Sequence, residues 1–224
     1  MPPAPPVPAP AAPAGTPRRP APSSRRERTR ERLLDAAYEV FAETGVAAAS
    51  VEEVCERAGF TRGAFYSNFA TKEELFSALL ERENGDVLAA LGERIDALLP
   101  EGDAPPLDES RLGDLVLGLL EGPSDLRRWC LVENEWQLVA LRDPEVGRRW
   151  VADHDRFMDA LVPLVRRAAE RAGRRFVLDP DLAVRVVVGV YREGLTEAML
   201  RGAEDPARLR AELAEVVRAL TVAA

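Results

Sequence analysis

The chain has 224 residues, of which 46 % are hydrophobic, and it carries a net charge of −8. No apolar run approaches the roughly 20 residues that span a bilayer, and the first residues lack the basic and apolar regions of a secretory signal. We therefore expect a cytoplasmic protein that does not enter a membrane. Two cysteines and one histidine provide neither a disulfide framework nor a set of metal ligands, so we expect no metal or other cofactor.

The charge is distributed unevenly along the chain. Residues 1–32 contain seven arginines and two glutamates, a net charge of +5, so the remainder carries −13. Because attraction to phosphate is screened within about 10 Å, the local excess matters more than the total. An acidic protein with a basic N-terminal part can still bind nucleic acid.

Residues 1–23 are rich in proline and alanine and have no hydrophobic periodicity, which predicts a disordered arm. The arm could be a passive tail, or it could touch phosphates. Arg26 and Arg28, which lie next to the first predicted helix, are the candidates for such a contact.

The rest of the chain has the pattern of helices. One face of the first helix carries apolar or small residues spaced by three and four: Leu33, Ala37, Val40, Phe41 and Thr44. Gly45 is expected to end this helix in the left-handed conformation. Helix starts are marked by two capping boxes and by three Asp-Pro pairs: Ser50 with Glu53, Thr71 with Glu74, and Asp143-Pro144, Asp179-Pro180 and Asp205-Pro206.

These signals predict an all-α fold in two units. Residues 24–70 form a three-helix domain, and residues 71–224 form a larger helical domain with irregular breaks, one of them at residues 173–178. The only strand-like patch, Val186 to Val188, lies inside a helical pattern.

The most informative stretch runs from Ser50 to Phe69. A short amphipathic helix ends at Gly59, which can adopt the positive φ of a tight turn. Thr61 can cap a second helix, from Arg62 to Asn68, whose Phe65 and Phe69 face inward because they lie four residues apart. This order predicts a helix-turn-helix.

The outward face of the second helix carries only hydrogen-bonding or very small residues: Arg62, Gly63, Ala64, Tyr66, Ser67 and Asn68. It contains no acid, which suits a helix that enters the DNA major groove because a carboxylate there would face phosphates. Arg62 can reach a guanine edge through two hydrogen bonds. Tyr66 and Thr61 offer hydroxyls to phosphates, and Lys72 adds charge at a helix N-terminus.

The run from Ala58 to Phe69, followed by Thr71 to Leu75, resembles the DNA-binding signature of the TetR family of transcriptional regulators, with mild departures at Ser50-Val51 and at Cys55. The resemblance implies a homodimer that reads a near-palindromic site in double-stranded DNA, usually as a repressor released by a small molecule. Together with the residues themselves, it gives the predicted DNA-binding set: Arg26, Arg28, Ser50, Thr61, Arg62, Gly63, Ala64, Tyr66, Ser67, Asn68 and Lys72.

Two apolar stripes near the C-terminus suggest where two copies could meet. The first, in residues 182–200, and the second, in residues 206–221, contain the following: Val184, Val187, Val188, Tyr191, Leu195 and Met199, then Leu209, Leu213, Val216, Val217 and Leu220. Paired with their two-fold mates, two such helices would form a four-helix interface. The alternative is that both stripes pack inside one protomer.

An effector site is suggested by aromatic and polar residues on neighbouring helices: Trp129, Glu133, Trp136, Gln137, His154, Phe157 and Tyr191. A cavity of this kind suits a small apolar or aromatic molecule. For each residue the alternative is ordinary core packing.

Three other functions were weighed. An all-α metalloenzyme would need Glu-x-x-His pairs, which the chain lacks, so we expect no catalysis. A helical adaptor without DNA binding would have replaced Arg62, Tyr66 and Lys72. An activator of the same fold remains the alternative to a repressor.

Overall fold

A computed structural model describes residues 24–99, 115–116, 118–119, 126–202 and 207–224. The proposed N-terminal arm and the Asp205-Pro206 helix start lie outside the described residues. The helices and strands are, in chain order, α1 (Arg25–Thr44), α2 (Val51–Ala58), α3 (Arg62–Tyr66), α4 (Lys72–Leu98), α6 (Leu126–Arg142), α7 (Pro144–Arg171), β1 (Arg174–Phe176), α8 (Pro180–Leu200), α9 (Ala207–Leu220) and β2 (Thr221–Ala223).

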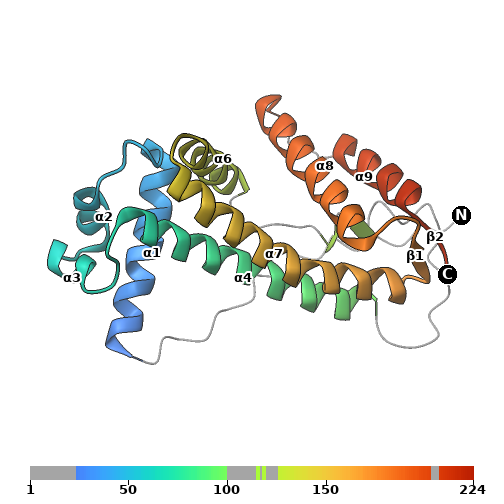
Figure 1. Ribbon diagram of the computed structural model, residues 1–224, viewed down its shortest axis with the longest axis horizontal. Helices are drawn as coiled ribbons and strands as arrows, with labels where there is room; N and C mark the ends of the chain where they lie inside the picture. Colours follow the sequence, from blue (N-terminus) through green and yellow to red (C-terminus); the bar gives the residue numbers. More distant parts are fainter. Residues whose placement is uncertain (1–23, 100–114, 117, 120–125, 203–206) are drawn as a thin grey trace, which may run out of the picture.

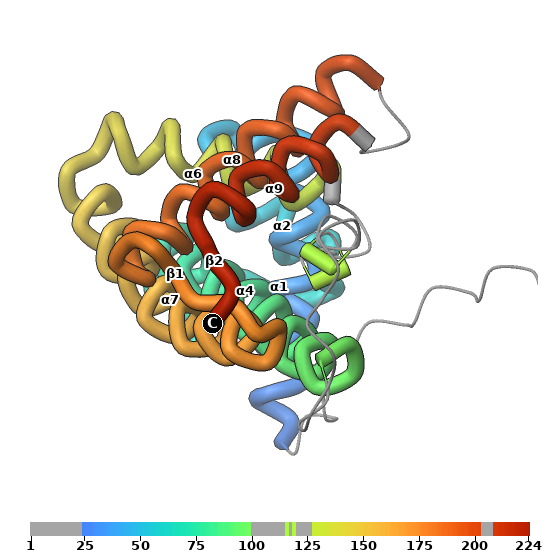
Figure 2. The backbone as a smooth tube through the Cα atoms, turned by 90° about the vertical axis from the view of Figure 1, so that its right-hand side faces the viewer, coloured from blue at the N-terminus to red at the C-terminus, as the bar shows by residue number. Residues whose placement is uncertain are grey.

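The molecule is elongated, as Figure 1 shows. Helices α1 to α3 form one end, and α4 and α7 lie side by side along its length. Helices α8 and α9 pack together at the other end, beside the C-terminus, and Figure 2 shows this pair from that end. None of the described helices is long and apolar enough to cross a membrane.

The predicted all-α fold is confirmed, with one small addition. Strands β1 and β2 pair in antiparallel fashion, with Arg175 opposite Val222. Strand β1 occupies the break expected at residues 173–178. Three residues per strand are too few for a recognisable alternation of polar and apolar residues, and the partners lie far apart in sequence, so the pairing left no local signal.

Helix caps account for most of the helix starts. Ser50 begins α2 with a complete capping box, and Asp143 and Asp179 cap α7 and α8 just before a proline. At Thr71 the box is incomplete, because the Glu74 carboxylate accepts from the N–H of Ala70. Gly45 has the expected positive φ of 82°, but its ψ of 151° lies outside the left-handed helical region.

The first hydrophobic core joins the three N-terminal helices to α4 and α6. Phe41, Phe65 and Phe76 are almost completely buried in it. Trp136 of α6 lies in the same core, where its ring stacks on Phe76 with centroids 4.0 Å apart. Helix α6 is therefore anchored in the N-terminal unit.

Two further cores hold the C-terminal part together. One lies between α4, α7 and α8, and the other between α8 and α9. A Cβ added to Gly194 would come within 2.5 Å of the Cδ1 atom of Leu209, so a larger residue there would force the Leu209 side chain to shift. Leu195 and Leu213 are buried in this contact. Much of the two predicted stripes thus packs inside the protomer.

Candidate nucleic-acid interface

The turn between α2 and α3 is fixed by a glycine and by an arginine from α1. Gly59 has φ 70° and ψ 36°, the left-handed conformation that the sequence predicts. The Arg32 guanidinium donates to the carbonyl of Ala58 at 2.7 Å and lies 4.6 Å from the ring centroid of Phe60. The clamp by Arg32 was not predicted, because it joins residues that lie 26 positions apart.

Helix α3 has five residues and ends earlier than predicted. The Ser67 hydroxyl and the Asn68 amide both donate to the carbonyl of Ala64 at 2.8 Å, and the backbone N–H of Asn68 donates to Phe65 instead of Ala64. Asn68 is consequently half-buried rather than turned outward. Phe65 and Phe69 are buried as predicted.

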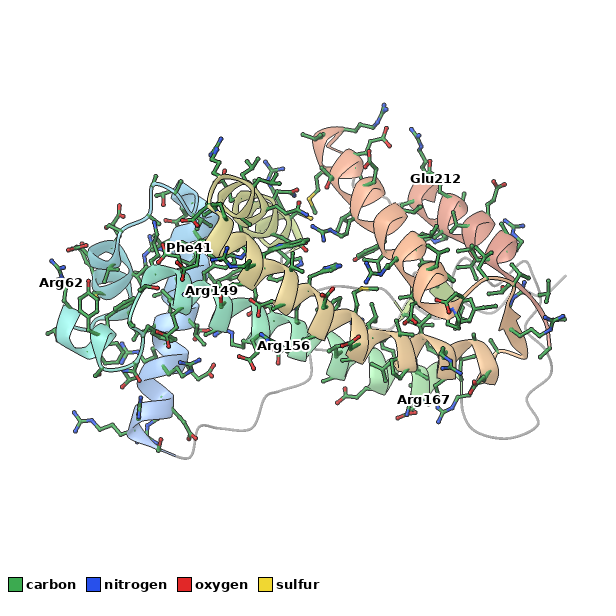
Figure 3. The ribbon with its side chains drawn as sticks, viewed as in Figure 1. Phe41, Arg62, Arg149, Arg156, Arg167 and Glu212 are labelled. Carbon is green, nitrogen blue, oxygen red and sulfur yellow. The ribbon has the colours of Figure 1, made fainter. Side chains whose placement is uncertain are left out.

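The remaining predicted residues of α3 form an open surface. Tyr66 is 50 % exposed, and Thr61, Arg62, Gly63 and Ser67 are exposed, with Ala64 partly so. In Figure 3 Arg62 extends away from the helices at the end of the molecule. The Thr61 hydroxyl accepts from the N–H of Ala64 and keeps its proton for another acceptor. The Ser50 hydroxyl instead donates to Glu53.

Arg62 is not free on this surface. Its Nη1 lies 2.6 Å from an Oε1 of Glu52, in the first turn of α2, and its guanidinium carbon lies 5.9 Å from the ring centroid of Tyr66. A hydrogen bond with Tyr66 and the charge of Glu52 raise the pKa of Arg62. The face of α3 is free of acids, but an acid of α2 borders it.

The beginning of α1 lies beside the end of α3. Arg26 Nη2 donates to the carbonyl of Ser67 at 3.4 Å, and the Arg30 guanidinium lies 4.5 Å from the ring centroid of Phe69. Arg28, on the same first turns of α1, is exposed. The basic N-terminal segment therefore borders the surface of α3.

The ammonium of Lys72 clamps the α1–α2 loop. It donates to the carbonyls of Val46 and Ala49, both at 2.8 Å, and lies 3.4 Å from that of Ala47. These acceptors match its three N–H donors. This geometry departs from the predicted phosphate contact, because the charge is already directed to backbone oxygens.

The residues predicted to line an effector site do not come together as one pocket. Trp136 is 1 % exposed in the first core, and Trp129 packs against the same core. Phe157 packs against the second core and Tyr191 against the third. These four side chains therefore pack in the hydrophobic cores, which was the alternative interpretation of their pattern. Gln137 is half-buried on α6.

Two of the predicted polar residues, Glu133 and His154, interact with Arg192 of α8. Glu133 Oε1 is 3.0 Å from Arg192 Nη1, and burial raises the pKa of Glu133 while Arg192 lowers it. Burial raises the pKa of Tyr191 to about 12. Burial and the charge of Arg192 lower the pKa of His154, whose ring stacks on Trp150.

A cavity of about 100 Å³ lies elsewhere, between α4, α7, α8, α9 and the strand ribbon. Its wall is apolar and includes Leu91, Ile95, Ala169, Val187 and Val217. Arg174 and Thr221 also border it, but the Arg174 Nε donates to the Thr221 hydroxyl at 2.7 Å. None of the seven predicted effector residues lines this cavity. In the described ranges, no group of three or more His, Cys, Asp and Glu could hold a metal ion.

Comparison with known proteins covers both halves of the chain. Residues 33–79 match the family described as bacterial regulatory proteins, tetR family. The transcriptional repressor AcnR of Corynebacterium efficiens is 27 % identical over 76 % of this chain and 88 % of its own. The repressor Rv1474c of Mycobacterium tuberculosis is 29 % identical, in an alignment that covers 82 % of this chain and 88 % of the relative.

Among solved structures, a TetR-family transcriptional regulator from Mesorhizobium loti superposes with a TM-score of 0.64. It covers 88 % of this chain and 96 % of its own, at 22 % identity, which supports the shared fold.

The helix-turn-helix of α2 and α3 lies in the part that matches this family of regulatory proteins, and the relatives that are similar over most of the chain are named as transcriptional regulators rather than enzymes. Residues 33–79 thus match the tetR family, and the relatives and the shared fold extend this similarity over most of the chain.

Proposed function

We propose that the protein is a homodimeric repressor that binds a near-palindromic operator and leaves it when a small molecule binds. Residues 24–70 act as the DNA-binding domain, and residues 71–224 bind the effector and the second copy. The observation that carries the DNA-binding proposal is the exposed, acid-free face of α3 beside the arginines of α1. Two relatives are named as repressors, which supports this sign of regulation.

Selection of duplexes from a random DNA pool tests the DNA-binding proposal. We expect an inverted repeat whose half-sites lie about 10 base pairs apart, or a multiple of that, because two recognition helices must enter successive major grooves. Arg62→Ala is expected to weaken binding by about 1–3 kcal/mol and to relax one base position. An enriched sequence that stays the same in this variant would contradict the role of Arg62. A reporter promoter that carries the selected site distinguishes repression from activation.

The dimer is proposed to form through the faces of α8 and α9 that the protomer leaves uncovered. On α8, Leu182 is 51 % exposed and Val186 is 38 % exposed. Gly189 is exposed as well, and a Cβ built there meets nothing within 4 Å. Val188, by contrast, packs on the α4–α7 core. The uncovered face therefore differs from the apolar stripe that the sequence suggests.

A large residue at Gly189 tests this interface. Gly189→Arg fits the protomer but would hold a second helix away, so sedimentation should show a monomer. Gly92→Arg is the matched control, because Gly92 is also a helical glycine with open space around it. A Gly189→Arg protein that remains a dimer would place the interface elsewhere.

For the effector, the apolar cavity favours a small uncharged molecule. The wall is apolar apart from Arg174 and Thr221, and the Arg174 guanidinium is already bonded to Thr221. At about 100 Å³ the cavity is smaller than the roughly 150 Å³ of an apolar cavity that holds benzene, so an aromatic molecule would have to widen it. Toluene should therefore raise the thermal unfolding midpoint and weaken operator binding, whereas benzoate should do neither.

Two substitutions on α7 make the effector test specific. Ala169→Leu fills the cavity and should abolish the response to toluene, whereas Ala160→Leu, on the exposed face of the same helix, should keep it. Equal responses in the two variants would rule out this cavity as the site.

A further inference from the structure

The ion pair between Glu52 and Arg62 places one carboxylate at the edge of the DNA-reading surface. Arg62 is the first residue of α3, and Glu52 lies in the first turn of α2. The side chain of Glu52 is 56 % exposed and that of Arg62 is 61 % exposed, and Glu52 Oε1 lies 2.6 Å from Arg62 Nη1.

The pair is poorly suited to a purely structural role. Ion pairs between exposed side chains contribute little to stability, since water and salt screen them. Two other acids of α2 lie nearby. Glu53 completes the capping box of the helix, and Glu56 is exposed one turn further along. Of these three, Glu52 is paired with the arginine predicted to read a base.

The fork geometry of arginine explains what this pairing can do. Glu52 occupies Nη1, and the Nε–H and Nη2–H groups lie along the neighbouring edge of the guanidinium plane. That edge offers two parallel N–H donors, which match the O6 and N7 acceptors of guanine. Arg62 can thus keep Glu52 and bind guanine at the same time once its hydrogen bond with Tyr66 gives way to the base.

The carboxylate also changes how Arg62 interacts with DNA of other sequence. An unpaired arginine on this surface would gain by turning to any nearby phosphate, and such contacts carry no sequence information. A carboxylate that holds the guanidinium reduces this gain and itself repels phosphate. Both effects weaken non-specific binding more than binding to a site that offers the guanine.

We infer that Glu52 is a specificity-determining positioning residue, which holds Arg62 so that its free edge reads guanine rather than the DNA backbone. The inference rests on the proposed base contact of Arg62. It assigns to α2 a part in sequence recognition beyond that of supporting α3.

The test compares Glu52→Gln with Glu56→Gln and Arg62→Ala in the full chain. Glu56→Gln removes the same charge from an exposed position of the same helix and controls for a general electrostatic effect. Each protein is used to select duplexes from a random pool. Its affinity for the wild-type consensus and for a scrambled duplex is then measured at several salt concentrations, and the thermal unfolding midpoint verifies that each variant is folded.

For Glu52→Gln we expect weaker guanine preference at the one position that Arg62→Ala relaxes. Affinity for the scrambled duplex should rise roughly two- to fivefold, and the salt dependence should steepen by about one unit because Arg62 becomes free to bind a phosphate. Glu56→Gln should leave the base preference intact.

Two results would overturn the inference while the base contact of Arg62 stands. One is an unchanged guanine preference in Glu52→Gln when Arg62→Ala relaxes that position. The other is the same change in Glu52→Gln and Glu56→Gln. If Arg62→Ala relaxes no position, the base contact itself fails, and the role of Glu52 fails with it.

Discussion

The two ends of the molecule obtain their structure in different ways. In the N-terminal unit, residues close in sequence set the helix starts and the corner: Ser50 caps α2, Gly59 forms the turn and Thr61 caps α3. Arg32 and Lys72 then reinforce the two turns from a distance. In the C-terminal part, caps such as Asp143 start the helices, but the cavity arises only where four helices and a ribbon of distant strands meet. The proposed DNA-reading surface of α3 is thus encoded largely by local sequence, whereas the proposed effector site depends on tertiary packing.

Helix α6 connects the two regions. Its Trp136 is stacked on Phe76 in the N-terminal core, and the Glu135 carboxylate lies 3.2 Å from where a Cβ of Gly45 would be. On the same helix, Glu133 pairs with Arg192 of α8. Helix α6 therefore contacts both the end of α1 and α8.

The largest effect is expected from removing a ring in the locally encoded unit. Phe65→Ala empties a fully buried position of α3 and should lower the free energy of unfolding by about 3–5 kcal/mol. Urea denaturation measures this loss. A loss below about 1 kcal/mol would mean that α3 is not held by its aromatic core.

A smaller loss is expected from Lys72→Met, which removes the clamp on the α1–α2 loop. Hydrogen bonds from a charged group contribute about 1.5–3 kcal/mol, so the free energy of unfolding should fall by roughly that amount. The salt dependence of DNA binding should stay unchanged. If it flattens by about one unit instead, Lys72 contacts a phosphate as the sequence alone suggested.

Next in size is the effect of the glycine corner. Gly59→Ala forces a side chain into the left-handed region and should cost about 1–2 kcal/mol. Gly92→Ala in α4, a helical glycine with open space, should instead stabilise the protein by about 0.5–1 kcal/mol. Thermal denaturation of both variants measures the contrast, and equal changes would contradict the role of the turn.

The smallest expected effect lies in the C-terminal part and depends on pH. The folded-state pKa of Tyr191, about 12, lies above its ordinary value of 10, so its contribution to stability is complete below pH 10 and is lost as the pH rises toward 12. Between pH 8 and pH 11 the wild type should lose about 1 kcal/mol more than Tyr191→Phe. Chemical denaturation at the two pH values measures this difference, and an equal loss would mean that Tyr191 titrates as it does in the unfolded chain.

The sequence predicted the fold class, the helix-turn-helix and the inward rings of Phe65 and Phe69, because these depend on spacing and capping within a few residues. It did not predict the contacts of Arg32 or the loop clamp of Lys72, which join residues more than 20 positions apart. Nor did it predict that Ser67 and Asn68 would end α3 by binding Ala64, since their side chains suit either role.

The predictions for the C-terminal part were less accurate, because contacts there also join residues far apart in sequence. An apolar stripe shows that a helix has a buried face but not which neighbour covers it, so the pattern of Val188 and Leu213 could not distinguish a dimer contact from packing within the protomer. Likewise, the aromatic character of Trp136 indicated burial, and only the tertiary structure places it in the N-terminal core.

The most direct test of the central claim, that the exposed face of α3 reads the major groove, is methylation interference on a selected duplex. Methyl groups on guanine N7 lie in the major groove, so they should block binding in two clusters about one helical turn apart, and Arg62→Ala should lose the interference at one guanine in each cluster. Interference confined to adenine N3 in the minor groove, or a pattern that Arg62→Ala leaves unchanged, would contradict the claim.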